Sequence, residues 1–214
     1  MNDAAPTVHL VDDEPAVRDS LSLLIASEGY SVAAHASARE FLDGCPPGTR
    51  GCVVADLRMP GMNGLQLQEE MARRGILLSI IFLTGHGDIP TSVRAIKAGA
   101  VDFLTKPVTA NELLQAIAAA LALSDQRLAD SSRSSSAAEL ISHLTERERA
   151  VMKLAAAGLS NKVIARQLGI SHRTVEIHKG RVMKKTGATS LINLTRLVRA
   201  AGFDDPGPDP LPGA

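Results

Sequence analysis

Polar side chains interrupt the N-terminal half of the sequence at the points where short apolar runs end. They are carboxylates, one hydroxyl and one ammonium group: Asp12, Asp13, Asp56, Thr84 and Lys106. Clustered carboxylates without Cys or His favour a hard divalent cation, and Mg²⁺ binds one or two carboxylates and keeps several waters. A carboxylate beside Mg²⁺ and an ammonium group can attack a phosphoryl group and form an aspartyl phosphate. These residue types therefore predict Mg²⁺-dependent phosphoryl chemistry, with Thr84 available to hydrogen-bond the phosphoryl group.

The alternation of apolar runs and helical patterns predicts the fold that would bring these residues together. Five runs have the length and composition of strands: Thr7–Val11, Ser31–His35, Cys52–Ala55, Ile80–Leu83 and Val101–Leu104. Helical spacing of apolar residues occupies intervals such as Pro15–Glu28, Leu65–Arg74, Ile89–Ala98 and Thr109–Leu123. Five strands that alternate with five helices predict an α/β fold with a doubly wound parallel sheet and helices on both faces. The polar residues follow the carboxyl ends of strands, the edge at which open parallel sheets bind ligands.

Four sequence motifs carry a resemblance to a known family. They are VDDE at 11–14, DLRMPGMNG at 56–64, TGHGD at 84–88 and KP at 106–107. Together they closely resemble the receiver domain of two-component response regulators, over about residues 6–123. The resemblance implies that Asp56 accepts a phosphoryl group. It also implies a cis peptide bond between Lys106 and Pro107, which is mainly a feature of bonds before proline.

The same resemblance implies a metal site and a switch around Asp56. Asp13 and Asp56 would bind Mg²⁺ directly, Asp12 would support it through water, and the backbone carbonyl of Arg58 would be the third protein ligand. The residues that sense phosphorylation would be Thr84, Phe103 and Lys106. In such a switch the hydroxyl moves toward the phosphoryl group, the aromatic ring turns inward and the lysine pairs with the new charge. The ring would also be a core residue of its strand.

The formal net charge of zero conceals two halves of opposite sign. Residues 1–124 carry 9 Lys and Arg and 14 Asp and Glu, whereas residues 140–202 carry 12 Lys and Arg and only 3 Asp and Glu. Between them, residues 124–139 are polar and Ser-rich, which is typical of a linker. We therefore predict a receiver domain at 1–123, then this linker, and a basic domain at 140–202. The tail at 203–214 is rich in Pro, Gly and Asp and is predicted to be disordered. A basic domain favours an anionic partner, most often nucleic acid.

The basic domain has the pattern of four short helices. Thr145 and Glu148 form a capping-box pattern at the start of the first, and Gly158 ends it. A short turn with a glycine at 168–170 separates the second helix from the third, which predicts a helix-turn-helix. The third helix, Ser171–Thr186, would enter the major groove of DNA.

One face of that helix has the composition of a DNA-reading surface. Its outward residues are Glu176, Ile177, Gly180, Arg181 and Lys184. An exposed Ile177 can pack on a thymine methyl group. Gly180 lowers helix stability by roughly 1 kcal/mol relative to alanine, which is consistent with a close approach to the duplex.

The stretch from 144 to 188 resembles the LuxR-type DNA-binding domain. By that resemblance Glu176, Ile177 and Gly180 would face bases. The residues near phosphates would be Lys162, Arg173, Thr174, Lys179, Arg181 and Lys184. The family often carries a longer basic residue at the position of Gly180, so we expect a different or weaker base preference at that step. The helix at 190–201 matches the dimerisation helix of the domain.

A receiver followed by this domain resembles the NarL/FixJ group of transcriptional regulators, and most closely its FixJ branch. The resemblance implies that a sensor histidine kinase phosphorylates Asp56, and that the phosphorylated homodimer binds double-stranded DNA, with RNA polymerase as a further partner.

The alternative is a Mg²⁺-dependent phosphohydrolase, an enzyme that forms the same aspartyl phosphate. Haloacid dehalogenase-type phosphatases place an acid two residues after the nucleophile, and Arg58 at that position is no useful proton donor. We therefore assign no catalytic residue. A constitutive DNA-binding protein with a vestigial receiver is disfavoured, because every site residue is present.

Composition excludes several other classes of protein. Aromatic residues make up 2% of the 214 residues, which disfavours stacking platforms for single-stranded nucleic acid. Cys45 and Cys52 form neither a CxxC motif nor zinc-binding spacing, so we expect a reduced, cytoplasmic compartment. The N-terminus lacks the pattern of a signal peptide, and no apolar run approaches the ~18 residues of a membrane span, so no membrane partner is expected.

Overall fold

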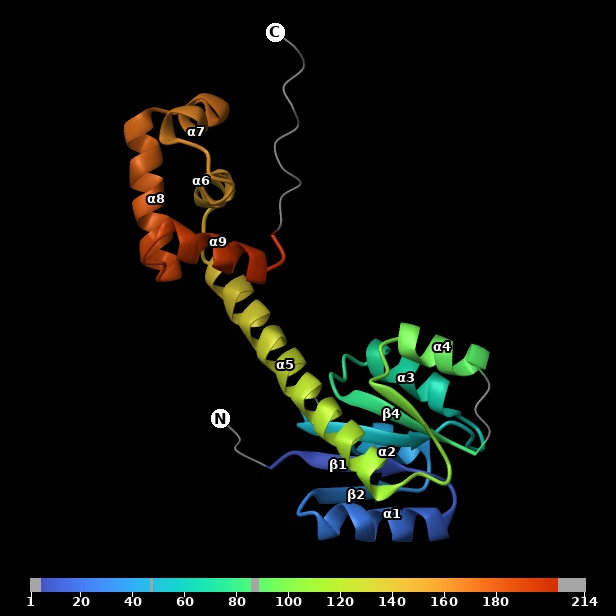
Figure 1. Ribbon diagram of the computed structural model, residues 1–214. Coiled ribbons are helices and arrows are strands. Elements are labelled where there is room, and N and C mark those ends of the chain that lie inside the picture. The colour runs from blue at the N-terminus through green and yellow to red at the C-terminus, as the bar shows by residue number, and fades with distance from the viewer. Residues whose placement is uncertain (1–4, 47, 86–88, 204–214) are drawn as a thin grey trace. The chain divides into compact units, whose positions relative to one another are not determined.

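The N-terminal half of the chain forms one parallel sheet. A computed structural model describes residues 5–46, 48–85 and 89–203 (Figure 1). The strands are β1 (Thr7–Val11), β2 (Ser31–His35), β3 (Gly51–Asp56), β4 (Ser79–Thr84) and β5 (Asp102–Thr105). They lie in the order β2-β1-β3-β4-β5, and all pairings are parallel. This confirms the predicted doubly wound sheet, and every strand lies within one residue of its predicted bounds.

Helices cover both faces of the sheet and enclose two apolar cores. They are α1 (Pro15–Ser27), α2 (Ala38–Gly44), α3 (Gly64–Arg73), α4 (Ile89–Lys97) and α5, which begins at Ala110. Side chains of α2 and α3 pack with Val11 and Val53 on one face. Side chains of α1 and α5 pack with Leu10 and Val54 on the other. Strands β3 and β4 are buried throughout because helices lie over both of their faces.

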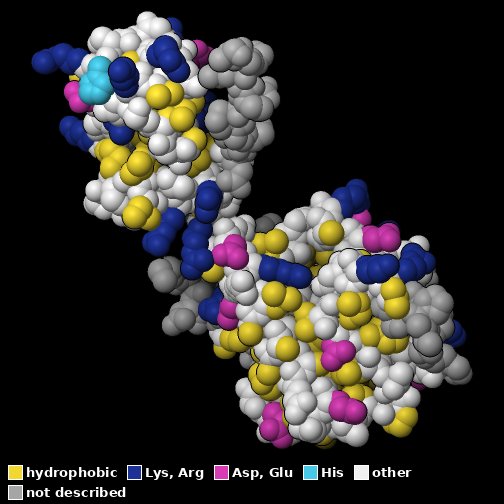
Figure 2. Space-filling view, turned by 45° about the horizontal axis from the view of Figure 1, so that its top comes forward, with side chains coloured by type: hydrophobic (Ala, Val, Ile, Leu, Met, Phe, Trp, Pro, Cys, Tyr) yellow, Lys and Arg dark blue, Asp and Glu magenta, His cyan; other side chains and the backbone are white. Residues whose placement is uncertain are grey.

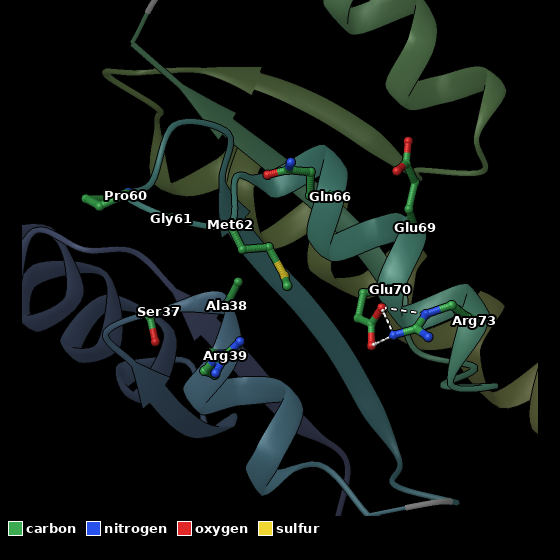
Figure 3. Close-up of a pocket in the computed structure, with 10 residues that line it drawn as sticks. All are labelled: Ser37, Ala38, Arg39, Pro60, Gly61, Met62, Gln66, Glu69, Glu70 and Arg73. Atoms are coloured by element: carbon green, nitrogen blue, oxygen red, sulfur yellow. Dashed lines mark hydrogen bonds and ion pairs between the residues drawn. The ribbon is translucent and has the colours of Figure 1, made fainter.

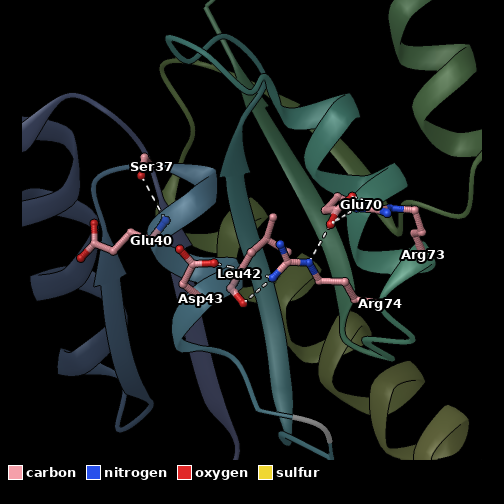
Figure 4. A network of polar contacts seen from close by, with 7 residues as sticks. All are labelled: Ser37, Glu40, Leu42, Asp43, Glu70, Arg73 and Arg74. Atoms are coloured by element: carbon pink, nitrogen blue, oxygen red, sulfur yellow. Dashed lines mark hydrogen bonds and ion pairs between the residues drawn. The ribbon is translucent and has the colours of Figure 1, made fainter.

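A network of charged side chains joins α2 to α3 (Figure 4). Arg74 follows α3, and its Nε donates to Glu70 Oε1 at 2.6 Å. Its Nη1 donates to the backbone oxygen of Leu42 at 3.1 Å and lies 3.7 Å from Asp43 Oδ1. This arginine therefore fastens the last turn of α2 to α3.

All the regular structure described in the C-terminal unit is helical. Its helices are α6 (Glu146–Ala156), α7 (Asn161–Leu168), α8 (His172–Thr186) and α9 (Leu191–Ala200). The predicted capping box is present, since Thr145 and Glu148 exchange hydrogen bonds at the start of α6. Gly169 ends α7 with φ = 64°, a left-handed conformation that favours glycine. The turn between α7 and α8 confirms the helix-turn-helix pattern.

The Ser-rich segment differs from its prediction. We predicted that a helix ends at Leu123 and that a Ser-rich linker covers 124–139, but α5 is a single helix of 33 residues, Ala110–Ser142, which includes the predicted linker. The segment contains neither proline nor glycine, so no residue in it stops a helix, and serine is only moderately unfavourable there. Buried Ala137 and Ile141 add apolar contacts near the end of this helix. The chain divides into two compact units within α5, between Leu128 and Ala129.

Several sequence predictions concern segments outside this description. The loop residues 86–88 of the TGHGD motif and the predicted disordered tail beyond Phe203 lie outside the described residues.

Cys45 and Cys52 are both free and buried. Within the described ranges, no helix combines the length and the apolar character needed to cross a membrane.

Candidate functional site

The predicted acidic residues lie together at the carboxyl edge of the sheet. Asp12 follows β1, and Asp56 is the last residue of β3, the neighbouring strand. One carboxylate oxygen from each of Asp12, Asp13 and Asp56 lies within 4.8 Å of the others. Asp12 and Asp56 are buried and Asp13 is half-buried. Three carboxylates that the sequence separates by up to 44 positions therefore form one cluster.

Lys106 reaches this cluster from the end of β5 and bridges two of its carboxylates. Its Nζ donates to Asp12 Oδ2 at 2.7 Å and to Asp56 Oδ2 at 3.2 Å. Burial by itself would lower the pKa of Lys106, but the hydrogen bonds and charges of the two aspartates raise that pKa above its ordinary value. The peptide bond between Lys106 and Pro107 is cis, as the resemblance implied. The backbone N–H of Lys106 donates to the carbonyl of Thr84 at 2.6 Å, which fixes this loop to β4.

Backbone amides hold the other carboxylate oxygens. Asp56 Oδ1 accepts from the N–H of Arg58 at 3.2 Å, and Asp12 Oδ1 accepts from the N–H of Glu14 at 2.9 Å. Gly64 begins α3 beside this loop, and a Cβ there would lie 2.8 Å from the carbonyl oxygen of Asp56. A glycine at this position therefore allows α3 to begin close against the end of β3.

The two predicted switch residues lie on β4 and β5. Thr84 is the last residue of β4 and is fully buried. Phe103 on β5 is half-buried and packs against the core under α2 and α3. Its ring centroid lies 6.4 Å from that of Phe82, at an interplanar angle of 60°. The ring of Phe103 therefore packs against the core, as expected, and remains partly exposed to solvent.

The donor set at this edge fits Mg²⁺. Carboxylate oxygens are hard ligands, and three of them meet here. Asp12 and Asp56 each accept hydrogen bonds at both carboxylate oxygens, whereas no hydrogen bond to the carboxylate of Asp13 is seen among the described residues. An open hollow of about 600 Å³ is lined by Asp13 and Arg58, among others, and gives solvent access to the cluster.

A larger hollow lies away from these carboxylates, between α2 and the start of α3 (Figure 3). Its volume is about 750 Å³. Gln66, Glu69 and Arg73 extend from α3 beside it, and Arg39 extends from α2 (Figure 3). None of the three clustered aspartates lines this hollow. Although this hollow is the larger of the two, it is therefore not the predicted site of phosphoryl chemistry.

The predicted DNA-facing residues lie on the exposed side of α8 and on α7. Val175 and Val182 are buried under α8. Exposed residues occupy the other side: Arg173, Glu176, Ile177, Gly180, Arg181 and Lys184. Ile177 is 48% exposed although it is apolar. Lys162 on α7 is also exposed. Figure 2 shows many Lys and Arg side chains, in dark blue, on this unit.

Two of the predicted phosphate-contacting residues are partly engaged within the protein. Lys179 donates to Asn161 Oδ1 at 3.0 Å, which joins α8 to the start of α7. The hydroxyl of Thr174 lies 2.8 Å from that of Ser171, the N-cap of α8. Both are half-buried, so the structure brings them beside the exposed face rather than fully onto it.

Gly180 lies in open space. A Cβ at this position would meet no atom within 4 Å, and its φ is not positive. Neither packing nor backbone conformation among the described residues of the unit therefore requires glycine at this position.

Sequence patterns missed several polar contacts around these sites. Arg18 on α1 donates from Nη1 to the backbone oxygen of Asp12 at 2.7 Å. Lys185 on α8 donates to the buried carboxylate of Glu148 at 2.7 Å, and this contact lowers the pKa of Glu148 to about 2, aided by the amide of Thr145. Long charged side chains on amphipathic helices usually face solvent, so neither residue had a local signal that distinguished it.

Comparison with known proteins matches both halves of the chain to families. Residues 8–118 match the response regulator receiver domain, and residues 142–198 match the bacterial regulatory proteins of the luxR family. The chain is 45% identical to the transcriptional regulatory protein FixJ of Azorhizobium caulinodans, over 91% of this chain and 92% of that protein.

Two solved structures resemble nearly the whole chain. A low-resolution structure of the response regulator StyR has a TM-score of 0.76 and 43% identity, and the match covers 92% of this chain and 99% of that one. Full-length FixJ from B. japonicum has a TM-score of 0.56 and 40% identity, and the match covers 94% of this chain and 98% of that one.

Proposed function

The chain belongs to the FixJ-like response regulators, transcription factors that join a receiver domain to a LuxR-type DNA-binding domain, and we propose that phosphorylation of Asp56 controls it. The receiver implies transfer of a phosphoryl group from a kinase, and the second domain implies binding of DNA. The observation that carries the assignment of Asp56 is its place in the carboxylate cluster, with Lys106 bonded to its Oδ2.

In the proposed reaction, a carboxylate oxygen of Asp56 attacks the phosphorus atom of a phosphohistidine on a sensor kinase. The P–N bond breaks as the new P–O bond forms, and the kinase histidine leaves. Receiver domains generally bind Mg²⁺ through such an acidic pocket. Here Asp13, Asp56 and the carbonyl of Arg58 would hold the ion, with Asp12 acting through water, and Mg²⁺ would neutralise charge on the phosphoryl oxygens. The ammonium group of Lys106 would pair with the same oxygens.

Phosphorylation would act on the other domain through the receiver surface. It adds about −1.5 to −2 charges at Asp56. The hydroxyl of Thr84 would move toward this charge, and the ring of Phe103 would turn into the vacated space. The surface formed by α4, β5 and the start of α5 would then pair two receivers. Tethering two DNA-binding domains in one dimer can raise avidity by about 10²–10⁴.

The DNA-binding unit would read the major groove with α8. We assign Glu176, Ile177 and Gly180 to the bases. The phosphate contacts would come from Lys162, Arg173, Thr174, Lys179, Arg181 and Lys184. The exposure of the first three residues supports direct reading of bases. Such a regulator works in the cytoplasm, where RNA polymerase would be a further partner.

The alternative phosphohydrolase reading is not favoured. Its general acid would stand two residues after Asp56, where this chain has Arg58. The relatives are transcriptional regulators.

The assignment of Asp56 is tested by phosphorylation with acetyl phosphate. Asp56→Asn should abolish the acid-labile phosphoprotein, while Asp19→Asn, at an exposed position on α1, should be labelled like the wild type. Wild-type labelling should require Mg²⁺. Phosphate-affinity gel electrophoresis measures the labelled fraction, and undiminished labelling of Asp56→Asn would contradict the assignment.

A further inference from the structure

Arg18 links helix α1 to the acidic cluster through the main chain. It lies in the second turn of α1 and is half-buried. Its guanidinium Nη1 donates to the backbone carbonyl oxygen of Asp12 at 2.7 Å. The contact is short and charge-assisted, which makes it one of the stronger kinds of protein hydrogen bond.

The acceptor of this bond is important because of the residue that follows it. The carbonyl of Asp12 belongs to the planar peptide unit that ends at the N–H of Asp13. An interaction that fixes this oxygen also fixes the direction in which Asp13 leaves the strand. Other contacts hold the rest of Asp12: its N–H donates to the carbonyl of His35 at 3.2 Å, and its carboxylate binds the N–H of Glu14 and Lys106. Asp12 is thus held from several sides.

Asp13 has less support of its own. It is half-buried, and no hydrogen bond to its carboxylate is seen among the described residues. Yet one of its oxygens lies within 4.8 Å of oxygens on Asp12 and Asp56. The position of this carboxylate therefore depends mainly on the backbone that carries it.

We propose that Arg18 is a positioning residue for the metal site: by holding the Asp12–Asp13 peptide, it keeps the carboxylate of Asp13 in register with that of Asp56. This inference rests on the proposed function, because it takes these two carboxylates as the direct ligands of the cation. It adds a residue on α1 that touches neither the cation nor the phosphoryl group.

Because Arg18 is positively charged, a positioning role and a purely electrostatic role predict opposite changes in cation affinity when it is removed. A guanidinium group remains charged at every relevant pH, so by Coulomb repulsion alone it weakens the binding of a divalent cation nearby. If charge were its only effect, its removal would tighten cation binding. If it positions Asp13, its removal weakens cation binding despite the loss of a repelling charge.

The test measures binding of Mn²⁺ to the full-length, unphosphorylated protein. Mn²⁺ takes oxygen ligands in the same geometry as Mg²⁺, and free Mn²⁺ is counted directly by electron paramagnetic resonance. Arg18→Met keeps an apolar stem but removes the donor and the charge. Arg18→Lys keeps both the charge and a donor. Arg39→Met is the matched control, since Arg39 is an exposed arginine whose side chain shows no hydrogen bond within the described ranges.

We expect Arg18→Met to weaken Mn²⁺ binding about tenfold, the size typical for loss of a residue that orients a metal ligand. Arg18→Lys should recover most of this loss, and Arg39→Met should bind like the wild type. Binding by Arg18→Met that is equal to or tighter than that of the wild type would overturn the inference. Circular dichroism checks that each variant is folded, and if Arg18→Met does not fold, wild-type binding by a folded Arg18→Gln would overturn the inference in its place.

Asp13→Asn separates this inference from the proposed function. If Asp13→Asn binds Mn²⁺ as the wild type does, the metal site itself is wrong, and the role of Arg18 falls with it. If Asp13→Asn loses binding and Arg18→Met does not, only the role of Arg18 is overturned.

Phosphorylation by acetyl phosphate gives a second readout. Arg18→Met should raise the Mg²⁺ concentration for half-maximal rate by about the same tenfold, while the rate at saturating Mg²⁺ stays near that of the wild type. A fall in the saturating rate with an unchanged Mg²⁺ requirement would contradict a positioning role.

Discussion

Lys106 is the residue whose charge offsets two buried carboxylates at once. Its ammonium group contacts both Asp12 and Asp56. Removal of one partner from a buried ion pair leaves an uncompensated charge and typically costs about 3–5 kcal/mol. We expect Lys106→Met to lower the unfolding temperature at neutral pH, and Mg²⁺ to recover part of this loss by replacing the missing cation.

Calorimetry with and without Mg²⁺ measures both effects of Lys106→Met. Lys97→Met, at an exposed position on α4, is the control and should respond to Mg²⁺ as the wild type does. If Mg²⁺ stabilises Lys106→Met no more than the wild type, the cation and the ammonium group do not share this site.

His9 predicts a dependence of stability on pH. It lies on β1, 92% buried, with its Nδ1 3.2 Å from Nε2 of His35 and both rings packed on Phe41. Burial, and then the charge of His35, lowers the pKa of His9 from 6.5 to about 4. Burial also lowers the pKa of His35, which Glu40 partly opposes. Below pH 6.5 the unfolded state therefore binds a proton at His9 that the folded state does not.

Stability should consequently fall as the pH drops from 6.5 to about 4, by roughly 3 kcal/mol from His9 alone. Urea unfolding at several pH values measures this dependence. His9→Leu should flatten the profile in this range, whereas His143→Gln, at an exposed position, should leave it unchanged. An unaltered slope in His9→Leu would show that other groups cause the loss.

At the scale of elements, the proposed function places on α8 both residues that would read bases and residues that would contact phosphates. Lys184→Ala should weaken binding to all DNA sequences and reduce the salt dependence by about one unit, as for one phosphate contact. Glu176→Ala is the contrasting variant and should relax the preference at one base pair, since a carboxylate accepts from cytosine N4. Fluorescence anisotropy with several DNA sequences and salt concentrations measures both. A uniform loss in Glu176→Ala would count against base reading there.

The elements also show which features a sequence pattern can predict. Strands β3 and β4 are apolar on both faces and are followed by polar residues, so both the sheet and the position of Asp56 and Thr84 at its edge followed from the order of residues. The continuation of α5 beyond Leu123 did not follow, because a Ser-rich segment permits helix and coil alike. Its first part is fixed by tertiary contacts: Ser124 accepts from the N–H of Ser79, and Asp125 binds Arg50. Such contacts between residues far apart in the sequence leave no local pattern.

At the scale of the whole molecule, the two units carry opposite charge on one chain. The proposed switch requires that phosphorylation pair two receivers and so bring two basic units to the same DNA. With beryllofluoride and Mg²⁺ as the mimic of the phosphoryl group, we expect light scattering to show a change from monomer to dimer, and gel shifts to show tighter DNA binding.

The matched control for this experiment is Asp56→Asn, which should remain monomeric with the mimic. A wild-type protein that remains monomeric while its DNA binding increases would contradict the dimer mechanism. If the protein is already a dimer without the mimic, phosphorylation does not regulate DNA binding through receiver dimerisation.

Gly180 has a consequence for how the recognition surface can change over evolutionary time. A side chain at this position would occupy empty space on an exposed helix face, and replacement of glycine by alanine inside a helix adds roughly 1 kcal/mol of stability. The fold therefore tolerates substitutions there, and if Gly180 faces bases as proposed, selection acts on them through the operator. A duplicated copy of this regulator could acquire a different set of target promoters by one substitution, without a compensating change elsewhere in the protein.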